Sequence, residues 1–163
     1  MSRANYSDDV DSSRLNVWRG AVASAIRGKR GQAFLQELAD AMDAMPDKRL
    51  ISHAGSVDGC MCTLAVVASV RGLDMDRLNH LMEEADTDSI ASMLGIADAM
   101  AREIMFENDE GVGDSYWLGG GYYNHPHPSI KAIEEKRWSA MRAWVSAHLA
   151  APTAAKTKLP EVV

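Results

Sequence analysis

The stretch Ile26-Arg27-Gly28-Lys29-Arg30-Gly31-Gln32-Ala33-Phe34-Leu35-Gln36-Glu37-Leu38 decides the fold, because two glycines bracket a basic turn that opens directly into a helical pattern. Before the turn, apolar residues recur at helical spacing from a cap at Ser12 or Ser13. After it, the same spacing runs from Gly31 to Met45, where Pro46 ends it. The sequence therefore predicts a helical hairpin in which Gly28 ends the first helix.

The remaining patterns predict further helices, with Lys48 to Ile51 as a short β element and 52–59 as a loop. Cys60 to Arg71 reads as a buried central helix that Gly72 caps, with a β-strand as the alternative. The other predicted helices follow caps at Asp74, Thr87 and Ser129, or lie between Ala97 and Asn108. Along the last of these, one side carries Ile130, Ile133, Arg137 or Trp138, Met141, Trp144 and Leu149.

Length and composition indicate one globular domain. The chain has 163 residues, of which 47% are hydrophobic and 25% are charged, a size at which one core is expected. We expect a mostly α fold, a single-domain bundle of about six to seven helices, over residues 12–150. We expect residues 1–11 to form a polar arm, 109–128 a loop excursion rich in glycine and aromatic residues, and 151–163 a disordered tail.

The chain shows no predicted membrane span, signal peptide or disulfide framework. The longest apolar run, from Met61 to Val70, is about half the length that a bilayer crossing requires, and the N-terminus lacks the apolar core of a signal peptide. The only cysteines, Cys60 and Cys62, lie too close in sequence to cross-link distant segments. We expect a cytoplasmic protein with reduced, packed thiols.

Charge is unevenly distributed along the chain. Residues 74–114 contain twelve acidic side chains and two arginines, a net charge of −10, whereas residues 14–49 have a net charge of +3 and the whole chain −6. Opposite charge fields favour different partners. The acidic candidates for partner binding are Glu103, Glu107, Asp109, Glu110 and Asp114.

Residues 89–104 have the spacing of a helix-turn-helix, with Ala91 at the crossing, Gly95 in the turn and Ile104 packing back. Its second helix presents acidic side chains and a single arginine, Arg102. Phosphate contact requires the opposite charge, so direct DNA binding is disfavoured and a structural corner is favoured. A DNA-binding regulator stays among the alternatives.

The basic turn is a candidate anion site. A helix N-terminus favours negative charge, and Arg19, Arg27, Lys29 and Arg30 lie near it in the predicted hairpin. The turn lacks the full glycine-rich loop that ends in Lys-Ser/Thr, so it is no Walker motif. A solvated connection between two helices is the competing interpretation.

No catalytic or metal-binding pattern stands out. Cys60-x-Cys62 and His125-x-His127 supply four ligand types that zinc uses, but one-residue spacings are not those of zinc knuckles. No serine lies in a Gly-x-Ser-x-Gly elbow, and nothing supports a triad. We therefore predict no cofactor, no metal and no enzymatic activity.

Four aromatic residues in the predicted loop offer rigid contact area for a partner, or anchors that fix the loop to the body. They are Tyr116, Trp117, Tyr122 and Tyr123.

Six segments carry a resemblance to a known family, of which the longest is Trp18-Arg19-Gly20-Ala21-Val22-Ala23-Ser24-Ala25-Ile26-Arg27-Gly28-Lys29-Arg30-Gly31-Gln32-Ala33-Phe34-Leu35. The others lie at 6–9, 45–51, 71–75, 106–111 and 135–138. Together they resemble small proteins from phages and prophages of proteobacteria, a family with no catalytic assignment to transfer. The chain departs from that pattern at 117–130, which looks like an insertion.

The resemblance implies a phage accessory protein that acts by binding. The first hypothesis is therefore an inhibitor of host defence or of nucleic-acid machinery, which docks on a basic host protein complex through its acidic surface. The alternatives are a small anion- or nucleotide-binding module at residues 27–32 and the helix-turn-helix regulator.

Overall fold

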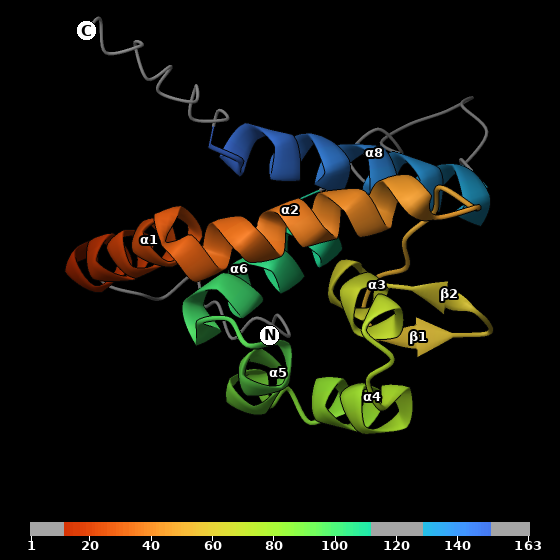
Figure 1. Ribbon diagram of the computed structural model, residues 1–163, viewed down its shortest axis with the longest axis horizontal. Helices are drawn as coiled ribbons and strands as arrows, with labels where there is room; N and C mark the ends of the chain where they lie inside the picture. Colours follow the sequence, from red (N-terminus) through yellow and green to blue (C-terminus); the bar gives the residue numbers. More distant parts are fainter. Residues whose placement is uncertain (1–11, 112–128, 151–163) are drawn as a thin grey trace, which may run out of the picture.

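The computed structural model describes residues 12–111 and 129–150 and confirms the mostly α fold. Seven helices and one two-stranded sheet lie in these ranges: α1 (Ser12–Arg27), α2 (Lys29–Ala44), β1 (Ser56–Val57), β2 (Cys60–Met61), α3 (Thr63–Val70), α4 (Met75–Glu83), α5 (Thr87–Leu94), α6 (Asp98–Asp109) and α8 (Ile130–His148). Figure 1 shows α2 crossing the middle of the molecule, with α8 on one side and α3 and α6 on the other. No helix in the described ranges is long and apolar enough to span a membrane.

The predicted helical hairpin is present, but its connection is a single residue. Gly28 has extended backbone angles and is the N-cap of α2. Lys29 and Arg30 therefore belong to the first turn of α2, and the four-residue basic turn expected from the sequence is corrected to Gly28 alone. Gly31 is needed for close packing, since a Cβ there would lie 2.0 Å from the Ala25 carbonyl oxygen.

The core forms around α2, which contacts α1, α3 and α8. Its buried side includes the predicted Phe34, Leu35, Leu38 and Met42. Apolar spacing that is wide enough to face several neighbours suits a helix at the centre of a bundle. After α2 ends, Lys48 Nζ donates to the carbonyl oxygens of Met42 and Asp43 and so adds to the hydrogen bonds at the C-terminal end of the helix.

The short β element lies later than predicted. Residues 48–51 form no strand, and β1 and β2 pair instead in an antiparallel hairpin with Val57 opposite Cys60. Asp58 and Gly59 both have positive φ, of 50° and 81°. Two consecutive residues with positive φ form a tight turn whose twist matches that of the paired strands. The Asp-Gly pair is therefore the sequence feature that indicates this hairpin.

The hairpin also shortens the predicted central helix. Cys60 and Met61 pair with β1, so α3 begins at Thr63 and not at Cys60. The helix is buried as expected, and Gly72 follows it with a positive φ of 66°. This left-handed conformation suits glycine because it lacks a Cβ.

Two of the predicted N-caps, Asp74 and Ser129, are confirmed, whereas α1 already includes both Ser12 and Ser13. Asp74 accepts a hydrogen bond from the Arg77 amide at 3.0 Å, and Ser129 accepts one from the Ala132 amide at 3.2 Å. One cap is corrected: Asp86, not Thr87, precedes α5 and accepts from the Ser89 amide. The next helix, α6, continues through Asp109, one residue beyond the predicted end at Asn108. The predicted loop over 109–128 therefore cannot begin at Asp109.

The α5–α6 corner has the predicted geometry. Ala91 and Ile104 are buried, and Gly95 adopts the left-handed conformation between the helices. Arg102 is held inside the fold, because its Nε lies 2.8 Å from Asp98 and donates to Thr87 Oγ1 at 3.0 Å. Its guanidinium also lies over the Trp18 ring at 5.4 Å. The one arginine of the corner is thus engaged within the fold.

A buried polar network joins α3, α6, α8 and the segment after α2. Asn108 Oδ1 accepts hydrogen bonds from both the amide and the hydroxyl of Thr63, at 3.1 and 2.7 Å. Its Nδ2 donates to the Ile51 carbonyl oxygen at 3.0 Å. Arg137, which is 8% exposed, donates to the Leu50 and Asn108 carbonyl oxygens. Buried polar groups are thereby paired, as stability requires.

Helix α8 buries Arg137, Met141 and Val145. Two of these were on the predicted face. Ile130, which the spacing also placed there, is 76% exposed because it lies in the first turn, ahead of the buried face.

Replacing Gly31 with alanine should destabilise the protein by about 1–3 kcal/mol, since the added methyl group overlaps backbone atoms of α1. Gly20→Ala is the matched control, because a Cβ there meets nothing within 4 Å. That change should stabilise by about 0.5–1 kcal/mol through helix propensity. Denaturant unfolding of both variants measures the difference, and equal effects at the two sites would contradict the close packing at Gly31.

Asn108→Asp should lower the free energy of unfolding by about 2–3 kcal/mol at neutral pH. The substitution keeps the shape but replaces the donor that faces the Ile51 carbonyl and the Asp109 carboxylate. Asn16→Asp on the exposed side of α1 is the control and should change stability little. If both variants unfold at the same denaturant concentration, Asn108 does not hold the network.

Candidate functional site

Helix α1 has an unusual charge pattern: it contains three arginines and no acidic residue. Two of them, Arg19 and Arg27, lie on one stripe with Ala23 at i, i+4 and i+8. Residues at this spacing share one side of a helix, and the two arginines lie about 12 Å apart along its axis. The small Ala23 leaves room between them.

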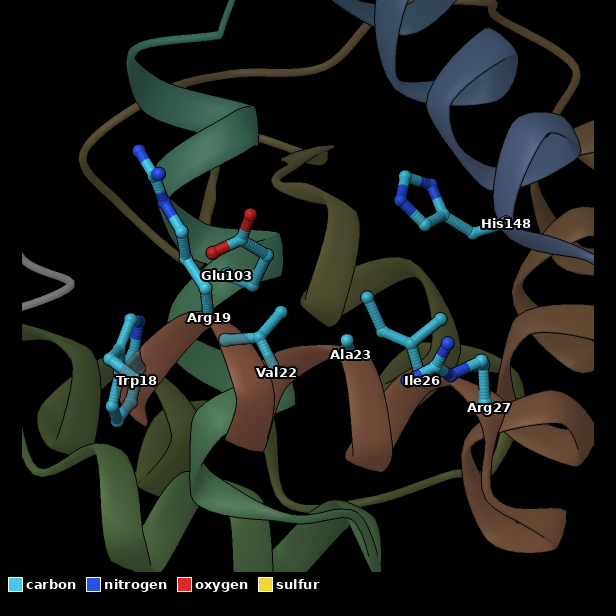
Figure 2. Close-up of a pocket in the computed structure, with 8 residues that line it drawn as sticks. All are labelled: Trp18, Arg19, Val22, Ala23, Ile26, Arg27, Glu103 and His148. Carbon is cyan, nitrogen blue, oxygen red and sulfur yellow. The ribbon is translucent and has the colours of Figure 1, made fainter. Parts of the chain in front are cut away.

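This stripe borders a pocket of about 310 Å³ between α1, α6 and α8, which we call the α1–α6–α8 pocket; its lining residues are Trp18, Arg19, Val22, Ala23, Ile26, Arg27, Glu103 and His148. Figure 2 shows Val22, Ala23 and Ile26 on α1 between the two arginines, with Glu103 coming from α6 and His148 from α8. The pocket thus combines an apolar floor with charged or polar groups from three helices.

The arginines of the pocket differ from those that the fold engages, and within the described ranges they share their unpaired state with the exposed Arg14, Arg30 and Arg77, which lie outside the pocket. Arg49, Arg71, Arg102, Arg137 and Arg142 each bond a carboxylate, a carbonyl or both. Arg19 and Arg27 are exposed and, within residues 12–111 and 129–150, make no hydrogen bond or ion pair. An unpaired guanidinium presents five N–H donors that can bind a carboxylate or a phosphate.

The end of α8 is fixed against the α1–α2 junction by Gln32. Its Nε2 donates to the carbonyl oxygens of Ile26 and His148, at 2.8 and 3.0 Å. Its Oε1 accepts from the Ala150 amide at 2.7 Å. These three bonds hold the last turn of α8 next to α1, and so keep His148 at the pocket.

The acidic wall of the pocket belongs to α6. Glu107 follows Glu103 by one turn and is half-buried. Burial raises the pKa of Glu107 above its ordinary value, the charge of Glu103 raises it further, and His148 opposes the shift. The α6 wall is therefore a site of accumulated negative charge that the fold only partly compensates.

The structure divides the predicted basic site. Arg19 and Arg27 line the pocket, whereas Lys29 and Arg30 lie exposed in the first turn of α2 and outside its lining. Trp18 and His148 complete the pocket, and they were not among the predicted site residues. No local signal marks His148, because it reaches the pocket only through the packing of α8 on α2 and its bond to Gln32.

The predicted acidic surface is not one continuous face. Glu103 lines the pocket, and Glu110 is exposed at the end of α6. The Asp109 side chain is 2% exposed, and its carboxylate accepts hydrogen bonds from Asn108 and from the His53 amide. Asp114 and the aromatic candidates Tyr116, Trp117, Tyr122 and Tyr123 lie outside the described residues.

The described ranges contain no group of three or more side chains that could hold a metal ion. Cys62 is buried and Cys60 is half-buried, while His125 and His127 lie outside those ranges.

Searches against protein-family models, curated proteins and solved structures find no match to this chain. The resemblance to phage and prophage proteins therefore stays a prediction, and the geometry of the pocket is the main guide to function.

Glu107→Gln should raise the melting temperature at pH 7–8 and leave it unchanged near pH 4. Because the pKa of Glu107 is higher in the folded chain than its ordinary value of 4.5, the folded state loses stability as pH rises through the folded value. A neutral glutamine avoids that loss. Glu110→Gln, at the exposed end of the same helix, is the control; a rise of equal size in both variants would contradict the role of burial.

Proposed function

We propose that this chain is a binding protein for an anionic ligand, with the α1–α6–α8 pocket as the site and Arg19 and Arg27 as the anion contacts. The observation that supports this most directly is the pair of unpaired guanidinium groups on either side of a buried apolar floor. Val22 and Ile26 in that floor are only 8% and 5% exposed. Such a mixture of apolar lining and a few convergent polar groups is typical of ligand sites.

The rest of the fold supports a site that exists before the ligand arrives. Gln32 fixes the end of α8, and the α1–α6 contact fixes the opposite wall. A ligand that meets a preformed site avoids the entropic cost of ordering it. The 12–36 segment also contains no acidic side chain to compete for the arginines locally.

Docking of an acidic surface on a host protein, in a phage setting, stays a prediction. It gains less support from the geometry, because Asp109 is engaged inside the fold and Glu103 faces the pocket. Exposed acids do lie on α4 and α5, among them Asp76, Glu83 and Asp88. Such a partner would contact these acids of α4 and α5, or Glu110 at the end of α6, and not Asp109.

Replacing both Arg19 and Arg27 with alanine should abolish stabilisation by anions. In the wild type, pyrophosphate or ADP at about 100 times its dissociation constant should add about 2.7 kcal/mol, which is about 5–10 °C in melting temperature for a domain of this size. The variant lacks both anion contacts and should show no shift. Thermal denaturation with and without each anion measures it.

The matched control replaces Lys29 and Arg30 with alanine, which removes the same charge from an exposed turn outside the pocket. This variant should keep the anion shift. Loss of the shift only in the Lys29/Arg30 variant would place the anion at the N-terminus of α2. The absence of any shift in the wild type would contradict anion binding altogether.

A further inference from the structure

The two sides of the α1–α6–α8 pocket have opposite hydrogen-bonding character. Arg19 and Arg27 on α1 supply donors only. Glu103 on α6 supplies a carboxylate, which in its ionised form is an acceptor and not a donor. Because a carboxylate has about four acceptor positions, Glu103 can bind a ligand as well as a partner within the protein. Figure 2 shows these groups around one cavity, with His148 on its remaining side.

The hydrogen bond of His148 determines what it offers to the pocket. Its Nδ1 lies 2.8 Å from the Trp144 carbonyl oxygen. A carbonyl oxygen can only accept, so Nδ1 carries the proton in this arrangement. In the neutral ring, Nε2 is then an acceptor and has no bond among the described residues. With the ring neutral, His148 and Glu103 form an acceptor side of the pocket, on helices other than the one that holds the two guanidinium groups.

This arrangement disfavours a ligand that is only an anion. Glu103 and Glu107 lie one turn apart on α6, and their mutual repulsion is the second cause of the raised pKa of Glu107. A bare phosphate or an acidic peptide would meet the same repulsion. A ligand that matches both sides carries an anionic group at one end and N–H or O–H donors at the other.

We infer that the ligand is a nucleoside phosphate, whose phosphate binds Arg19 and Arg27 while its ribose hydroxyls or base amine donate to Glu103 and His148. The inference rests on the proposed function and adds the class of ligand to it. The base of the nucleotide covers the apolar floor of Val22 and Ile26. The cavity of about 310 Å³ lies at the small end of the range for ligand pockets, about 300–1,000 Å³, which suits a single nucleotide and not a polymer.

Glu103 is accordingly the residue that determines specificity. Calorimetric titration of the full chain with ADP, GDP and pyrophosphate tests this. The wild type should bind at least one of the nucleotides about tenfold or more tightly than pyrophosphate, which is the gain expected from one hydrogen bond to a charged group. In Glu103→Gln that preference should fall to about threefold or less, whereas Glu110→Gln should keep it.

The outcomes separate the two claims. If pyrophosphate and the nucleotides bind equally and both need Arg19 and Arg27, the anion site stands and the nucleotide inference is overturned. If Glu103→Gln increases the affinity for ADP, GDP and pyrophosphate by the same factor, Glu103 only repels anions, and the inference is again overturned. If no ligand binds the wild type, or an acidic peptide binds in an Arg19-dependent manner while nucleotides do not, the nucleotide class is wrong. Circular dichroism and melting temperature verify that each variant folds.

Discussion

One buried guanidinium, that of Arg137, holds α8 against α6 and against the segment that follows α2. Its donors reach the Leu50 and Asn108 carbonyl oxygens at 3.0 and 2.9 Å. Burial lowers the pKa of Arg137, and the charges of Asp109 and Glu134 oppose that effect. A buried charge is costly unless it is paired and hydrogen-bonded, so this geometry specifies one arrangement of α6 and α8.

The network matters for the pocket because α6 and α8 supply two of its walls. Glu103 lies on the same helix as Asn108, and His148 lies at the other end of the helix that contains Arg137. Gln32 then fixes the far end of α8 to the α1–α2 junction. The basic α1 stripe and the acceptor groups of α6 and α8 are thus held around one cavity by groups outside the site itself.

Features set by neighbouring residues were predictable from the sequence. The helical hairpin, the caps at Asp74 and Ser129, the cap at Gly72 and the turn at Gly95 follow from local chemistry, and the structure confirms them. Features set by distant residues were not. Thr63 at the start of α3 is paired by Asn108, which lies 45 positions away, and no periodicity reveals such a partner.

The same difference between neighbouring and distant residues applies to the candidate site. Arg19 and Arg27 were identified through their closeness in sequence to Gly28, although the pocket, and not the turn, brings them together. Asp109 was misjudged because an acidic residue in an acidic segment is usually exposed, whereas here it accepts two hydrogen bonds within the fold. His148 required knowledge of how α8 packs.

Backbone amide NMR during titration with ADP tests most directly whether the α1–α6–α8 pocket is the binding site. We expect the shift changes to concentrate at residues 18–27, around Glu103 and at His148, the groups that line the cavity. Changes concentrated at Lys29 and Arg30, or on α4 and α5, would contradict it, because those residues lie outside the pocket.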